Sequence, residues 1–292
     1  MKKSCLLVAM AALLLSGCTA NSGSQESQTT KSSSQQAAQV KKASSKKNVK
    51  RDRQKKTAAT SQSSSSLPAT SASSSAATNS SQNTAASRIA FLNQQLIKQL
   101  GQVVLPQADG LSSGSQQLNI RYQGNAANFT VYYSIGTTAK AFNVAALSAE
   151  SPYAQFSKQT YSSVTAAQQQ IGYRAAADFS GLPTVDLGSG NLTGTIDSGA
   201  GQRYLSWYEG RWFLTVHAAA VNQENPLPLA KQTAAFLEIY LLPTPRTYGR
   251  ITFQAANTND LNQEIIWQEN NVVYQLKTQT PQTALKMAVS VK

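Results

Sequence analysis

The chain has 292 residues and a formal net charge of +13, with 26 basic and 13 acidic side chains, one histidine and two cysteines. A zinc site built from several histidine and cysteine ligands is therefore excluded. Residues 88–292 carry 14 basic and 11 acidic side chains, a net charge of +3, so most of the excess positive charge lies before them. That C-terminal region is long enough for one sizeable hydrophobic core or two small ones.

The N-terminus has the three-part layout of a secretory signal. A basic start at residues 1–3 precedes an apolar run from Cys5 to Leu15, which is too short to span a bilayer as a mature helix. The run ends in Leu15-Ser16-Gly17-Cys18, which resembles the lipobox of bacterial lipoproteins. In that family the cysteine is acylated and the peptide is cut before it. The resemblance implies a signal peptide at residues 1–17 and a mature chain that begins with a lipidated Cys18.

Lipidation would also explain the cysteine content. Removing the signal peptide removes Cys5, so Cys18 would be the only thiol of the mature chain, with no partner for an intrachain disulfide. The diacylglyceryl group of the lipobox family supplies two fatty-acyl chains, such as palmitate, and two chains give stable anchoring. We therefore expect a membrane lipoprotein on the extracellular face of the cell membrane. The alternative is an ordinary signal peptide with a chance cysteine.

Residues 18–87 form a predicted tether. Serine, glutamine, alanine, threonine and asparagine dominate, and aromatic residues are absent, so the segment cannot bury enough apolar surface to fold and is predicted to be disordered. It contains a basic block of Lys41, Lys42, Lys46, Lys47, Lys50, Arg51, Arg53, Lys55 and Lys56. For an exported protein we expect anionic wall polymers or lipid headgroups as partners of this block, and no nucleic acid. The alternative is a solvated, non-adhesive run of charge.

The first part of the ordered region, which we place at residues 88–292, switches from helical to period-two patterning. The predicted elements are a helix over 87–101, a hairpin of strands 118–122 and 129–135, a helix over 162–171, and short strands around 185–187 and 192–196. Ser87 and Gly101 are the start and stop signals of the first helix, and Gly172 ends the second.

An internal similarity follows. Residues 207–216 align without gaps with residues 267–276, and both copies read as strand, tight polar turn, strand. A turn at Glu209-Gly210 would place Trp207 opposite Trp212, and the second turn would lie at 269–270 or 270–271. In each copy the large apolar residues share one face, so Trp207, Trp212 and Trp267 are interpreted as core residues, with aromatic ligand platforms as the alternative.

Each predicted hairpin is followed by a helix. Asn225-Pro226 opens a helix with apolar residues at 229, 236, 237, 240 and 241 that stops before Pro243, and Thr280-Pro281 opens the last helix. The sequence therefore predicts an α+β fold. It would consist of an antiparallel β-sheet built from neighbouring hairpin-helix units, with the helices packed on one face.

The stretch from Leu182 to the end resembles a group of uncharacterised cell-surface lipoproteins of lactic acid bacteria. The similarity rests on residues 182–187, 207–212 and 267–276. The end of the chain, from Trp267 to Val291, is also similar to a small domain of unknown function in envelope proteins of Gram-positive bacteria. Neither resemblance implies an activity, a cofactor or catalytic residues.

The hairpin face opposite the tryptophans carries the candidate ligand-contact residues Tyr204, Tyr208, Arg211, Phe213 and His217. Such an aromatic and basic strip is typical of a sugar or anion contact surface. The alternative is that the sheet is covered on both faces, in which case these residues pack inside the domain. No catalytic residues, metal site or cofactor are predicted.

The sequence favours a non-enzymatic binding or scaffolding protein of the cell envelope and leaves enzymatic activity undecided. The alternatives are a hydrolase acting on envelope polymers or peptides, which would show a cleft with perturbed acids, and a carrier of an apolar ligand, which would show an apolar pocket between sheet and helices.

Overall fold

The computed structural model describes residues 76–112, 117–188 and 190–292. The signal peptide, Cys18, the basic block and the tether up to residue 75 lie outside these residues. The helices are α1 (Ala76–Leu100), α2 (Val164–Ile171), α3 (Leu227–Ile239) and α4 (Pro281–Val289). The strands are β1 (Leu118–Gly124), β2 (Phe129–Ile135), β3 (Ala154–Thr160), β4 (Thr184–Asp186), β5 (Thr193–Gly199), β6 (Gln202–Glu209), β7 (Trp212–Ala219), β8 (Gly249–Gln254), β9 (Gln263–Glu269) and β10 (Val272–Thr278). Short 3-10 helices lie at Ala145–Ala149, Ala176–Phe179 and Ala220–Asn222.

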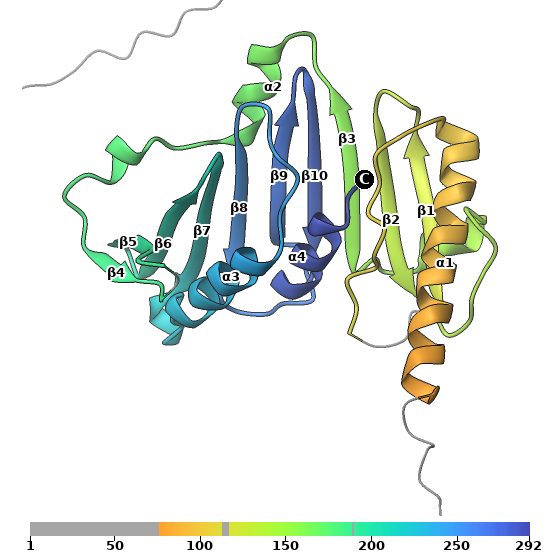
Figure 1. Cartoon of the computed structure of the whole chain (residues 1–292), viewed down its shortest axis with the longest axis horizontal. Coiled ribbons are helices and arrows are strands. Elements are labelled where there is room, and N and C mark those ends of the chain that lie inside the picture. Colours follow the sequence, from red (N-terminus) through yellow and green to blue (C-terminus); the bar gives the residue numbers. More distant parts are fainter. Residues whose placement is uncertain (1–75, 113–116, 189) are drawn as a thin grey trace, which may run out of the picture. The chain divides into compact units, whose positions relative to one another are not determined.

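These strands form one ten-stranded sheet in the order β1-β2-β3-β10-β9-β8-β7-β6-β5-β4 (Figure 1). Neighbouring strands are antiparallel except for β7 and β8, which run parallel and are connected through α3. A parallel pair needs such a crossover because a short turn cannot return the chain to the same end of the sheet. The predicted α+β class is confirmed, although the sheet is mixed rather than purely antiparallel.

The first hairpin and the second helix occur where the sequence predicts them. β1 and β2 pair from Leu118 opposite Ile135 to Gly124 opposite Phe129. The side chain of Ser163 accepts a hydrogen bond from the backbone N–H of Ala166 and caps α2, which ends at Gly172 in the left-handed conformation.

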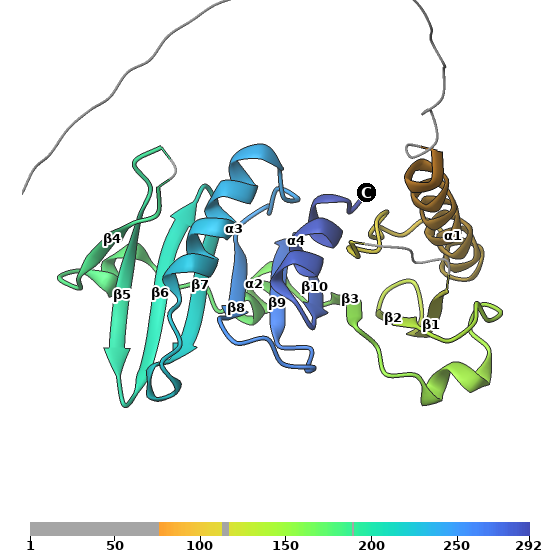
Figure 2. The same cartoon turned by 90° about the horizontal axis from the view of Figure 1, so that it is seen from below.

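The tryptophan face of the sheet holds the main hydrophobic core. Trp207, Trp212 and Trp267 are buried, as predicted. They belong to one cluster with Leu92 of α1 and with buried side chains of α3 and α4. Figure 2 shows α1, α3 and α4 along the same side of the sheet.

The prediction that all helices pack on one face is wrong for α2. Ala167 and Ile171 of α2 pack against Ile266 of β9 and Val273 of β10. Ile266 lies between Ile265 and Trp267, whose side chains belong to the main core, and successive side chains of a strand point to opposite faces. Alpha-helix α2 therefore covers part of the second face.

The first tryptophan hairpin turns one residue later than predicted. Glu209 pairs with Trp212 and Trp207 with Leu214, so the turn residues are Gly210 and Arg211. Gly210 has a φ of +58° and Asn270 takes +57° at the equivalent place of the second hairpin. A hairpin turn of two residues needs a positive φ at its first position, which glycine and asparagine adopt at low cost and glutamate does not. The shift leaves both tryptophans on the same face.

The two tryptophan hairpins are also not direct neighbours. Strand β8 lies between them, pairing with β7 on one side and β9 on the other. The outer strand of the second hairpin, β10, pairs with β3, and Val272 lies opposite Thr160. The backbone of Leu105 exchanges two hydrogen bonds of 3.0 and 3.2 Å with that of Lys292, so the end of the chain is fixed beside the segment that follows α1.

Helix α1 begins at Ala76, eleven residues before the predicted start at Ser87. The additional stretch contains several alanines, which have the highest helix propensity. From Ile89 on, the predicted spacing holds, because Ile89, Leu92, Leu96 and Leu100 are all buried.

Candidate functional site

The structure divides the five predicted contact residues among three places. Phe213 is buried, with 3% of its surface exposed, and its ring packs against Phe179 and Tyr173 at centroid distances of 5.6 and 6.1 Å. Tyr208 packs against the same group and donates a hydrogen bond of 2.9 Å to the carbonyl of Arg174. Burial, followed by the neighbouring Tyr173, raises the pKa of Tyr208 to about 12. These two residues form part of a covered aromatic cluster.

Tyr204 and His217 remain accessible on the same face of the sheet. Their rings stack at 4.7 Å with an interplanar angle of 24°, and Tyr204 is 41% exposed. The imidazole lies between two amide side chains, with Nε2 2.7 Å from Oε1 of Gln202 and Nδ1 2.5 Å from Oε1 of Gln254. This pair keeps an exposed aromatic surface, while both ring nitrogens of His217 have partners within the protein.

Arg211 belongs to neither group. It lies in the β6–β7 turn, and its Nη1 donates hydrogen bonds to the backbone carbonyls of Pro245 at 2.9 Å and Arg246 at 3.1 Å. These bonds hold the segment that leads from α3 into β8 against the turn. Arg211 therefore has a structural role next to a pocket that sequence reasoning did not identify.

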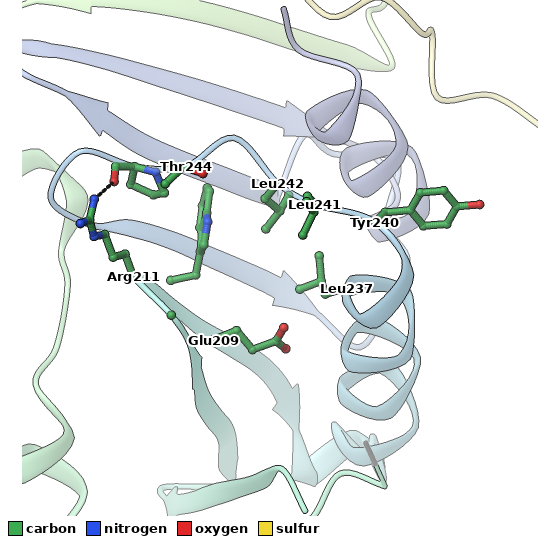
Figure 3. A pocket seen from close by; sticks show the side chains of 10 residues that line it. Glu209, Arg211, Leu237, Tyr240, Leu241, Leu242 and Thr244 are labelled. Carbon is green, nitrogen blue, oxygen red and sulfur yellow. Dashed lines mark hydrogen bonds between the residues drawn. The ribbon is translucent and has the colours of Figure 1, made fainter. Parts of the chain in front are cut away.

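That pocket lies at the C-terminal end of α3 and has a volume of about 500 Å³ (Figure 3). Its walls come from the β6–β7 turn, the last turn of α3 and the segment after it. The residues that line it are Glu209, Gly210, Arg211, Trp212, Leu237, Tyr240, Leu241, Leu242, Thr244 and Pro245. The volume lies within the range of about 300–1,000 Å³ that is usual for small-molecule sites, and the lining is mostly apolar with few polar groups, as such sites usually are.

The local sequence explains why apolar side chains are exposed here. Tyr240 adopts an extended conformation and its N–H still bonds to the carbonyl of Phe236, so α3 ends at Ile239. The predicted helix continued through Tyr240 and Leu241, and this part of the prediction is wrong. Ile239 is 74% exposed and Leu241 is 87% exposed. A run of apolar residues that leaves the helix cannot follow its buried face, so some of the side chains must point to solvent.

Glu209 provides the carboxylate of the pocket. Its Oε1 accepts a hydrogen bond of 2.7 Å from the indole N–H of Trp207. Burial raises the pKa of Glu209, the bond from Trp207 lowers it in part, and the charge of Glu238 raises it further. In Figure 3 the carboxylate of Glu209 points toward α3, whereas Arg211 points away toward the carbonyl of Pro245.

A second polar cluster lies far along the sheet and has a structural role. Glu150 accepts hydrogen bonds from Lys140 at 2.6 Å, Ser134 at 2.6 Å and Asn119 at 3.1 Å. Desolvation opposes ionisation of this carboxyl group, but the three donors outweigh it and lower its pKa. Each group of this network is satisfied by another, which is how a partly buried charge is tolerated.

Only one feature of the sequence indicates the pocket. Ile239-Tyr240-Leu241-Leu242 is a run of four apolar residues followed by Pro243 and Pro245, and such a run exceeds what one helical face can bury.

Among the described residues, no group of three or more histidine, cysteine, aspartate or glutamate side chains is placed to hold a metal ion. The described part of the chain contains no helix with the length and hydrophobicity that a membrane span requires.

Comparisons with known proteins give no further information about the site. No protein-family model, no curated protein and no solved structure matches the chain.

Proposed function

We propose that the chain is a lipid-anchored protein of the cell envelope whose folded part is a non-enzymatic binding module, and that the pocket beside α3 takes up an apolar group. The observation that carries the binding role is the exposure of Leu241, at 87%, at a pocket of about 500 Å³. The Leu15-to-Cys18 sequence supports the anchor, the extracellular location and the resemblance to bacterial surface lipoproteins.

The exposed apolar surface of Leu241 and its neighbours would favour ligand binding. Each Å² of apolar surface removed from water contributes about 25 cal/mol, and fully burying a leucine side chain contributes about 1.5–3 kcal/mol. In the free protein, Leu241 is almost fully solvated and Tyr240 is half exposed. An apolar ligand group between Leu241, Leu237 and Trp212 would recover part of that free energy, whereas the ring of Tyr240 points away from these side chains (Figure 3). This arrangement favours ligand binding over a purely scaffolding role.

The tether would bring this module to its surroundings. The basic block at residues 41–56 supports contact with anionic wall polymers or lipid headgroups, since each lysine or arginine near an anionic surface contributes about 1 kcal/mol. We propose no nucleic-acid partner and no cofactor.

We also infer that the segments ending in α3 and α4 are two copies of one hairpin-helix unit. The support is a shared contact: Trp207 donates to Glu209 at 2.7 Å and Trp267 donates to Glu269 at 3.4 Å. In both segments the two residues of a Trp-x-Glu sequence lie on one face of a strand, where an indole N–H can reach the carboxylate.

Replacing Cys18 with alanine should abolish lipid anchoring of the mature chain. Without the thiol there is no site for acylation, so the chain should accumulate as an uncut precursor or be released from the cells. Membrane fractionation with an immunoblot measures both outcomes, and Cys5→Ala is the control that should leave anchoring intact. A mature-sized Cys18→Ala protein in the membrane fraction would show that the anchor is not at Cys18.

The pocket should bind a neutral apolar probe. We expect Nile red to gain fluorescence with the purified mature chain, residues 18–292, and Leu241→Ser to weaken this binding about 10-fold, because a leucine contact of roughly 1.4 kcal/mol is lost. Val221→Ser is the matched control, since Val221 is 72% exposed but does not line the pocket. Equal binding to all three proteins would place the dye elsewhere and contradict the pocket's role.

A further inference from the structure

We propose that the pocket beside α3 selects an amphiphilic amine, that is, a ligand whose aliphatic chain carries a positively charged ammonium group, with the carboxylate of Glu209 as its counterion. This inference rests on the proposed function, because it specifies the ligand of the same pocket. It goes further by assigning the ligand a charge and a recognition residue.

The carboxylate of Glu209 is positioned to meet a ligand in the pocket. Glu209 reaches the pocket from the end of β6 and points toward α3 (Figure 3). Its hydrogen bond comes from the neutral indole N–H of Trp207 and uses Oε1. An ionised carboxylate offers about four acceptor positions, so this bond leaves capacity for an ammonium donor. Hydrogen bonds in which the donor or the acceptor is ionised are about twice as strong as those between neutral groups.

The charge around Glu209 favours a cationic ligand. Burial and the neighbouring carboxylate of Glu238 both raise the pKa of Glu209, so its surroundings disfavour the ionised form. A cationic ligand would remove this penalty by neutralising the charge, whereas an anionic ligand would add a third negative group. Complementary charge of this kind also disfavours wrong ligands.

Arg211, the arginine of the pocket, binds backbone carbonyls and does not pair with Glu209. The Nη1 group of Arg211 donates to the carbonyls of Pro245 and Arg246, and its side chain leaves the turn in the direction opposite to Glu209. No ion pair of Glu209 occurs within the ranges that the structure describes. Substitution of Arg211 would loosen the loop wall, whereas substitution of Glu209 changes the charge of the pocket directly.

The apolar wall of the pocket can accommodate the aliphatic part of the ligand. Leu237, Leu241, Leu242 and Trp212 surround the space next to the carboxylate. An ammonium group bound to Glu209 would carry its alkyl chain along these side chains toward the exposed end at Leu241. The pocket therefore provides an acidic group and an apolar wall within the reach of one small amphiphile.

The test compares three ligands of equal chain length that differ only in the head group. Octylamine is protonated at pH 7, 1-octanol is neutral and octanoate is anionic. Titration calorimetry with the mature chain, residues 18–292, should give an affinity for octylamine roughly 10-fold or more above that for octanol, with octanoate weakest. Quenching of tryptophan emission reports the same binding, because Trp212 lines the pocket.

Glu209→Gln then identifies the counterion. The variant keeps an oxygen acceptor for Trp207 but loses the charge, so octylamine should bind no better than octanol, while octanol binding should be unchanged. Glu224→Gln, which removes a carboxylate outside the pocket, should leave the preference for octylamine intact.

A stability measurement guards against misfolding of the variant. Because burial raises the pKa of Glu209, the folded state binds the proton of this carboxyl group more tightly than the unfolded chain does. The contribution of Glu209 to the stability of the fold therefore falls as the pH rises above the ordinary glutamate pKa. Glu209→Gln lacks that loss, so its Tm at pH 7 should equal or exceed that of the wild type.

The outcomes separate the two proposals. Equal affinity for all three ligands would overturn the inference and leave the apolar pocket in place. A preference for octylamine that survives in Glu209→Gln would also overturn it. If neither octylamine, octanol nor octanoate bound to the protein, the proposed function would be contradicted as well.

Discussion

Replacing Trp267 with alanine should lower the free energy of unfolding by about 3–5 kcal/mol, the usual cost of removing a large aromatic side chain from a core. Trp267 has no exposed surface, and its ring contacts Tyr274 at 5.3 Å, Phe156 at 6.1 Å and Trp212 at 6.4 Å between centroids. The substitution would leave a cavity bounded by three rigid rings on β3, β7 and β10, which cannot collapse easily to fill it.

Urea unfolding of wild type and variant, followed by circular dichroism, measures this effect. Phe91→Ala is the control, because Phe91 is an aromatic residue of α1 that is 50% exposed and should cost far less. A loss below 1 kcal/mol for Trp267→Ala, or tryptophan emission that is red-shifted and freely quenched in the folded wild type, would be inconsistent with a buried ring.

Gly249→Ala is expected to have the next largest effect, a loss of about 1–3 kcal/mol from overpacking. A β-carbon at this position would lie 2.5 Å from Cε3 and Cζ3 of Trp212. The indole cannot move away freely, because it packs against Trp267 on one side and lines the pocket on the other. The variant should therefore also change the affinity for Nile red.

The matched control is Gly199→Ala. Gly199 is likewise a strand glycine, but a β-carbon there would meet nothing within 4 Å, so the substitution should be close to neutral. Thermal unfolding of both variants and a dye titration measure the two expected effects. If both glycine variants lost the same stability, the cause would be backbone propensity rather than contact with Trp212.

Much of the fold could be predicted because local signals agreed with tertiary packing. The spacing of Ile89, Leu92, Leu96 and Leu100, the cap at Ser163 and the first hairpin are all decided within a short stretch of chain. The tryptophan hairpins were placed on the correct face even though the turn was misplaced by one residue. Positive φ at Gly210 decided that turn, and glycine there could have been used to choose it.

The remaining elements depend on contacts distant in sequence. Strand β8 is short, and its parallel partner β7 is reached only through α3, so no local pattern identifies the pairing. The sequence pattern also placed Tyr240 and Leu241 on a continuing helix. The helix ends before them, at Ile239, whereas Pro243 disfavours helical geometry only at Leu242, so the proline signal places the end too late. The pocket arises from that ending and from the loop that Arg211 holds in place, and neither follows from periodicity.

The pairing of β3 with β10 determines when this protein can finish folding. A chain that leaves a ribosome N-terminus first presents β1, β2 and β3 early, but β10, which covers the other edge of β3, follows only after β4 to β9. Until then, β3 has an open edge, and pairings between distant segments form slowly. The backbone bonds between Leu105 and Lys292 have the same dependence. A nascent chain should thus keep an unfinished sheet until β10 has been released. A chain that ended before β10 would leave one edge of β3 unpaired, although β1, β2 and β3 would still pair with one another.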